Sequence, residues 1–144
     1  MNIILIKGGW ILKKLVFSLF VPILLFGCSN EQTIEVAEVS MDEKNRYDIE
    51  EMVKSTDEVY SSTVILIDNE LLIAIQVKPW IGFKEQKVEK RLQKKIEEKY
   101  PDLNVVVSSD YKLLWESQKL IDEQDTKKIT DEVKKLKKLA KEET

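Results

Sequence analysis

The sequence predicts an α+β domain, with a small antiparallel sheet of three strands packed by helices and a long helical C-terminal tail. Residues 62–67 (STVILI) and 71–77 (LLIAIQV) are two β-rich runs separated by a short polar turn. An amphipathic helical pattern over residues 84–100 precedes a third β-rich run at 103–108, and two more helical patterns follow. These alternating periodicities give the order helix, strand, strand, helix, strand, helix.

The first helix is expected after Ser40, which stands three residues before Glu43 in the spacing of a capping box. Ile49, Met52 and Val53 then form one apolar face, and the pattern ends near residue 56. Upstream, residues 34–39 alternate apolar and acidic side chains, which is a weak strand pattern. If this segment pairs, the sheet has four strands and the order becomes that of the ferredoxin-like motif.

The two central strands are expected to form a hairpin through Asp68, Asn69 and Glu70, because Asn tolerates a positive φ. Residues 64–67 are apolar on both faces, so this strand should be central and covered on both sides. The next helix carries Val88, Leu92, Ile96 and Tyr100 four residues apart and should stop before Pro101.

Ser109 or Asp110 can cap the helix that follows the third strand. The last helix, from about residue 126, carries seven lysines, and its apolar face is formed by Ile129, Val133, Leu136 and Ala140. We expect it to pack through this face with its lysines in solvent; contact with anionic lipid is the alternative.

Charge and composition narrow the function. The chain has 23 basic and 26 acidic residues, and three of the lysines but no acids lie in residues 1–27. The remainder is therefore acidic, which argues against nucleic acid as a partner. There is no His, so the usual general base and the commonest zinc ligand are both missing. No glycine-rich phosphate loop is present, and we expect no cofactor.

No catalytic residue is expected either. The acidic doublets Glu50-Glu51, Asp57-Glu58 and Glu97-Glu98 lie among lysines, and adjacent helical residues do not face each other, so they should be solvated. Ser109, in the run Ser108-Ser109-Asp110, has no evident activating base, and helix capping explains the run better. The alternative is a cell-wall-modifying or ligand-processing enzyme with an unrecognised carboxylate site.

The only cysteine, Cys28, follows a basic pair (Lys13-Lys14) and a twelve-residue apolar run at 15–26 that is too short to span a bilayer comfortably. The run Leu25-Phe26-Gly27-Cys28 resembles the bacterial lipobox. This resemblance implies cleavage after Gly27 and a diacylglyceryl group on Cys28, with the protein held at the extracytoplasmic face of the membrane. An uncleaved anchor helix is the alternative.

These features divide the chain into a signal peptide (1–27), an acylated cysteine and tether (28–40), an α+β domain (41–122) and a charged C-terminal helix (123–144). A further hypothesis concerns the start. Lys7-Gly8-Gly9 is what a ribosome-binding purine run would encode if it were translated, which suggests that translation begins at Leu12 from an alternative start codon.

Trp80, Ile81 and Phe83 surround Gly82 where a strand should turn into a helix. Such loops are usually polar, so these residues are the candidate interaction patch for a partner or a membrane surface. The alternative is a loop that folds back over the end of the sheet.

The lipobox, the run VYSSTVILIDNELLIAIQVK, the basic helix and the run YPDLNVVVSSDYKLLWE together resemble the YhcN/YlaJ family of sporulation lipoproteins, most closely its YlaJ branch. The resemblance implies a lipoprotein of the forespore or spore membrane with a role in germination or spore properties. We therefore expect a non-enzymatic domain that binds a protein or wall component, or one that is purely structural.

Overall fold

The computed structural model describes residues 32–38 and 43–142. The predictions for Leu12, Gly27, Cys28 and the capping residue Ser40 therefore lie outside the described residues. The described segments form one compact unit. Its elements in chain order are β1 (Thr33–Glu38), α2 (Glu43–Lys54), β2 (Val59–Ile67), β3 (Glu70–Val77), the 3-10 helix η2 (Pro79–Lys84), α3 (Glu85–Lys99), β4 (Asn104–Ser108), α4 (Tyr111–Lys119) and α5 (Thr126–Glu142).

The α+β class and the predicted elements are confirmed, and the upstream strand does pair, so the sheet has four strands in the order β1-β2-β3-β4. The expectation of an antiparallel sheet was wrong at both edges. Only β2 and β3 are antiparallel, whereas β1 pairs parallel to β2 and β3 pairs parallel to β4. The reason is that α2 and α3 each carry the chain back to the end of the sheet where the previous strand began.

The order of elements along the chain is that of the ferredoxin-like motif. In this sheet, however, the two parallel strands of each βαβ unit are direct neighbours, with no other strand between them. The likeness to that motif is therefore limited to the order of the elements.

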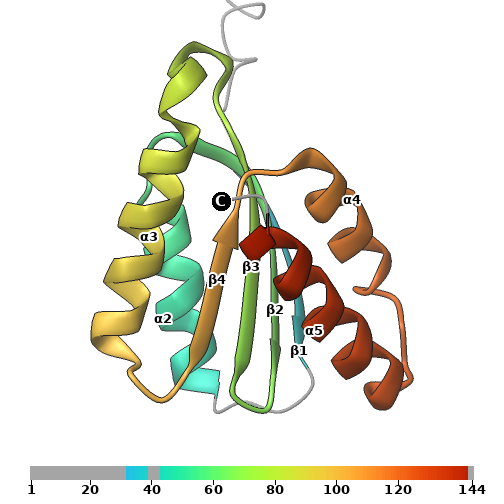
Figure 1. The fold of residues 1–144 in the computed structure, drawn as a ribbon. Coiled ribbons are helices and arrows are strands. Elements are labelled where there is room, and N and C mark those ends of the chain that lie inside the picture. The colour runs from blue at the N-terminus through green and yellow to red at the C-terminus, as the bar shows by residue number, and fades with distance from the viewer. Residues whose placement is uncertain (1–31, 39–42, 143–144) are drawn as a thin grey trace, which may run out of the picture. The chain divides into compact units, whose positions relative to one another are not determined.

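The sheet lies between two helical layers, with α2 and α3 on one face and α4 and α5 on the other (Figure 1). Alternate residues of β2 feed the two layers: Val64 and Leu66 pack with the first, Ile65 and Ile67 with the second. Burial on both faces explains why this strand reads as a continuous apolar run. Each such side chain contributes roughly 1.5–3 kcal/mol when it is fully buried.

The predicted C-terminal helical tail is α5, and it belongs to the second core. Its four apolar residues are buried against the sheet, as the sequence indicated: Ile129, Val133, Leu136 and Ala140. In the hairpin, the residue with a positive φ is Asp68 (φ 53°) rather than Asn69. Asp tolerates this backbone conformation almost as well as Asn does.

One lysine of α5 is buried. The Lys137 side chain is only 4% exposed; it forms an ion pair with Glu70 and also donates to the backbone carbonyl of Asn104. Asn104 Nδ2 donates to both oxygens of Glu70, at 2.9 and 3.2 Å. Burial lowers the pKa of Lys137. Burial alone would raise the pKa of Glu70, but hydrogen bonds from Lys137 and Asn104 outweigh it and the pKa lies below its usual value.

Candidate interaction surface

The connection between β3 and α3 projects from one end of the sheet (Figure 1). Pro79 begins η2, where its missing N–H costs nothing. Gly82 has φ 51° and ψ −133°, a conformation that L side chains rarely adopt. A Cβ at Gly82 would meet no atom within 4 Å, so glycine is needed here for its backbone and not for space. This kink separates the two halves of η2.

The three residues of the predicted patch divide in two. Trp80 is 73% exposed and Phe83 is fully exposed. Ile81 is partly buried and packs against the first core. The folded-back alternative therefore describes Ile81 alone, which holds η2 on the domain, while the two aromatic rings lie in solvent.

Two further aromatic side chains are exposed at the same end of the sheet. Tyr60 lies at the start of β2 and Tyr111 at the start of α4. With Trp80 and Phe83 they form what we call the aromatic end. Sequence reasoning missed both tyrosines, although Tyr60 stands in a polar stretch before the apolar run of its strand and Tyr111 directly follows a capping residue.

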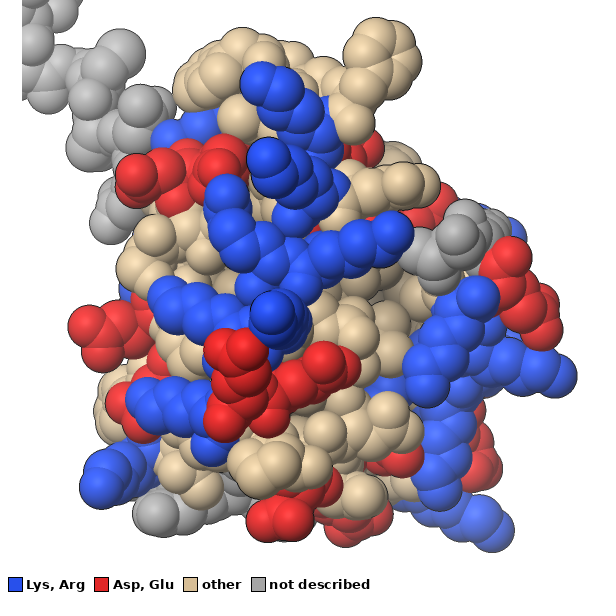
Figure 2. Space-filling view, turned by 60° about the vertical axis from the view of Figure 1, so that its left-hand side comes forward, with Lys and Arg blue, Asp and Glu red and all other residues tan. Residues whose placement is uncertain are grey.

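Basic side chains accompany the exposed rings. The Lys78 ammonium lies 5.7 Å from the centroid of the Trp80 ring, within cation–π distance. Lys84 and Lys87 are exposed in the first residues that follow Phe83. Figure 2 shows Lys and Arg side chains gathered beneath a tip of uncharged residues, with Asp and Glu side chains beside them. The surface thus combines aromatic rings with positive charge.

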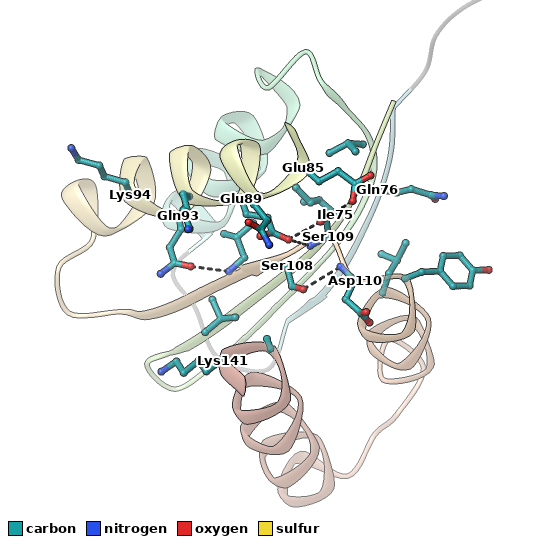
Figure 3. Close-up of a pocket in the computed structure, with 18 of the residues that line it drawn as sticks. Ile75, Gln76, Glu85, Glu89, Gln93, Lys94, Ser108, Ser109, Asp110 and Lys141 are labelled. Carbon is teal, nitrogen blue, oxygen red and sulfur yellow. Dashed lines mark hydrogen bonds between the residues drawn. The ribbon is translucent and has the colours of Figure 1, made fainter. Parts of the chain in front are cut away.

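A groove of about 890 Å³ lies beside this surface, between α3, the ends of β3 and β4, and α4 (Figure 3). Glu89 is buried in its wall, where one carboxylate oxygen accepts hydrogen bonds from the backbone N–H and the hydroxyl of Ser109. The hydroxyl bond is 2.7 Å long. Sequence reasoning missed Glu89, whose only signal was its place next to the apolar stripe of α3.

The run Ser108-Ser109-Asp110 has the structural role that the sequence indicated. Asp110 accepts a 2.7 Å hydrogen bond from the Leu113 N–H and so caps α4. Ser108 Oγ in turn accepts from the Asp110 N–H at 3.2 Å. These bonds shape one wall of the groove.

Side chains of α3 also cover the free edge of β4. Gln93 accepts from the Val107 N–H at 3.3 Å, and Glu89 accepts from the Ser109 N–H. An edge strand with unpaired N–H groups is a template for another strand, and side chains that occupy these groups block such pairing. We therefore do not regard β4 as a docking edge.

One carboxylate in each acidic doublet pairs with a basic neighbour: Glu50, Glu58 and Glu98. Glu58 pairs with Arg91 at 2.7 Å, and this hydrogen bond lowers its pKa. Glu50, which is half-buried, lies 3.8 Å from both Arg46 and Lys54 in an i,i+4 arrangement. Within residues 32–38 and 43–142, no group of three or more acidic or thiol side chains could hold a metal ion. None of the helices in these ranges is long and apolar enough to cross a membrane.

Comparison with known proteins gives the family. Neither the search of curated proteins nor the search of solved structures found a match. A family model described as "Sporulation lipoprotein YhcN/YlaJ" matches residues 29–139, which includes every strand and most of α5. This model covers both branches, so the assignment to the YlaJ branch stays a prediction. The match spans well over half of the chain, and the chain therefore belongs to the YhcN/YlaJ family of sporulation lipoproteins.

Proposed function

We propose that this protein is a non-enzymatic lipoprotein that displays its α+β domain outside the cytoplasmic membrane during sporulation or germination. The observation that carries the proposal is membership of a sporulation lipoprotein family, in a chain whose only cysteine ends the run Leu25-Phe26-Gly27-Cys28. Cleavage after Gly27 and a diacylglyceryl group on Cys28 would provide two acyl chains, which is enough for stable anchoring.

Binding is favoured over catalysis by the state of the polar groups in the domain. Glu89 and Asp110 are already occupied as acceptors for Ser109 and the Leu113 N–H. The exposed groups at the aromatic end are instead rings and ammonium groups, which recognise surfaces. The domain would then act at the membrane by contact with the bilayer, a protein or the cell wall.

A ligand-processing enzyme is the second candidate, and one observation favours it. The Ser109 hydroxyl donates to the buried carboxylate of Glu89 inside a groove large enough for a small ligand. A carboxylate can accept the proton of a nucleophilic hydroxyl. If this candidate were right, Ser109→Ala would abolish turnover of wall-derived peptides and sugars while leaving the fold intact. If the binding proposal is right, the wild-type protein shows no such turnover to abolish.

The proposal is tested by following a C-terminally tagged protein through sporulation beside its Cys28→Ala variant. The neighbouring substitution Ser29→Ala is the matched control. We expect the wild type and the Ser29→Ala variant to outline the forespore membrane and the Cys28→Ala signal to become diffuse or disappear. Identical membrane signal in all three would contradict the anchor, and uniform signal in vegetative cells would contradict the sporulation role.

A further inference from the structure

We propose that the aromatic end of the domain touches the bilayer that holds its lipid anchor, with Trp80 and Phe83 inserted among the headgroups of anionic phospholipids. This inference rests on the proposed anchor at Cys28. It adds a second membrane contact made by the folded domain itself, and it fixes which end of the domain faces the membrane.

The chain enters the domain beside the start of β2. Thr33, the first residue of β1, pairs with Ser61 near the start of β2. The Gln32 side-chain amide donates to the Val59 carbonyl at 2.6 Å, which ties the entering chain to that end. The N–H of Lys78, just before η2, donates to the Glu58 carbonyl at 2.8 Å. The entry point and η2 therefore lie at the same end of the sheet.

The tether between Cys28 and the domain is short. Cys28 and Gln32 are four residues apart, and an extended chain spans at most about 3.5 Å per residue, or about 14 Å here. An acylated Cys28 would therefore keep Gln32 within about 14 Å of the headgroups. The end of the domain that carries η2 lies within this reach, whereas the hairpin turn at Asp68 lies at the opposite end of β2.

The exposed side chains of this end suit a membrane interface. Trp is enriched at membrane interfaces because its ring suits the boundary between headgroups and acyl chains, and a second exposed aromatic ring adds apolar area. Lys78 lies against the Trp80 ring, and the exposed Lys84 and Lys87 closely follow Phe83 in the sequence, with one exposed acid, Glu85, between them. These ammonium groups would meet phosphate groups. This is the charge complement of an anionic bilayer.

The anchor also makes a weak contact sufficient. Once the acyl chains are inserted, binding of the aromatic end becomes an intramolecular step at high effective concentration. Figure 1 shows that η2 and the first turn of α3 project beyond the start of α4. The rings of η2 can therefore enter the interface while Trp115, which lies further along α4 than Tyr111, stays in water.

The experiment uses residues 28–144, which contain both hydrophobic cores and in which Cys28 is the only thiol. Coupling Cys28 to a maleimide phospholipid anchors the chain to vesicles of phosphatidylglycerol and phosphatidylcholine, whether or not cells acylate it. Trp80 and Trp115 are the only tryptophans in this segment. The Trp115→Phe variant therefore reports Trp80, and the Trp80→Phe variant reports the exposed Trp115 as a matched control.

Brominated lipid should quench Trp80 at least twofold, and acrylamide in the water should quench it less than in uncoupled protein. Trp115 should be quenched little by brominated lipid, and acrylamide should quench it equally in coupled and uncoupled protein. Equal behaviour of the two tryptophans would overturn the inference, as would shielding of Trp80 in spore membranes but not on vesicles, which would identify a protein occupant. Absence of acylation in cells would defeat the proposed anchor without changing the vesicle result, so the two failures are distinguishable.

Discussion

The buried ammonium of Lys137 predicts that losing Glu70 costs more than losing Lys137 itself. Glu70→Ala leaves a charge in a site that is 4% exposed, with only the Asn104 carbonyl as acceptor. Removing one partner of a buried pair costs about 3–5 kcal/mol. Because the Asn104 carbonyl still accepts from Lys137, we expect a cost at the low end, about 3 kcal/mol. Lys137→Met keeps the apolar stem, and Glu70 remains 18% exposed and bonded to Asn104. This variant should therefore lose only about 1 kcal/mol of unfolding free energy.

Urea unfolding of residues 28–144 at pH 7 measures this difference. With a slope of about 2 kcal/mol per molar, the midpoint should fall by about 1.5 M for Glu70→Ala and by about 0.5 M for Lys137→Met. The double variant should be more stable than Glu70→Ala alone, because it removes the stranded charge. Equal losses, or a larger loss for Lys137→Met, would refute the reasoning.

The pH dependence supplies a second check on the same residue. Because burial lowers the pKa of Lys137 below 10.5, the unfolded chain binds more protons between the two pKa values. Stability should therefore rise with pH across that window for this group, and the rise should vanish in Lys137→Met. Urea midpoints measured at several alkaline pH values test this rise. A wild-type curve as flat as that of Lys137→Met would contradict the burial of the charge.

Three other predictions concern the fold around the candidate surface. Asp110→Ala should cost about 1 kcal/mol in urea unfolding, because the Leu113 N–H loses its cap, and Asp110→Asn should recover most of it. The Arg91 hydrogen bond lowers the pKa of Glu58, so its contribution is complete above pH 4.5 and is lost as pH falls through the lowered pKa; Glu58→Gln should flatten this acid-side loss in urea midpoints. Gly82→Ala should lower the free energy of unfolding by about 1 kcal/mol, because only the positive φ opposes the substitution, and a lower melting temperature would report this loss. An unchanged melting temperature would show that η2 relaxes freely.

The sequence was sufficient to place the elements because their signals are local. The four-residue spacing from Val88 to Tyr100 and the stop at Pro101 needed no knowledge of the rest of the chain. The double-sided apolar run of β2 likewise indicated a strand covered on both faces, and the structure places helices there.

The direction of the edge strands could not be read in the same way. The alternating residues of β1 and the continuous apolar run of β4 indicate which faces are buried, but not which neighbour each strand pairs with or in which direction. That choice depends on α2 and α3, whose apolar faces share the first core through residues such as Val53 and Leu92. Such a contact between distant segments has no local signature.

The position of the candidate surface could be predicted from the sequence, but the exposure of its individual side chains could not. The apolar letters around Gly82 identified the position, but whether a ring packs or projects depends on the backbone kink. Ile81 reaches the core and Phe83 does not, although they stand two residues apart. The carboxylate of Glu89 was hidden because its partner, Ser109, lies twenty residues away.

The central claim is that Cys28 carries the lipid that holds this domain at the membrane. Mass spectrometry of the N-terminal peptide from membrane-purified protein tests it most directly. The account predicts a peptide that begins at Cys28 and carries the mass of a thioether-linked diacylglyceryl group. A peptide that continues through Gly27 to a free Cys28 thiol would contradict it.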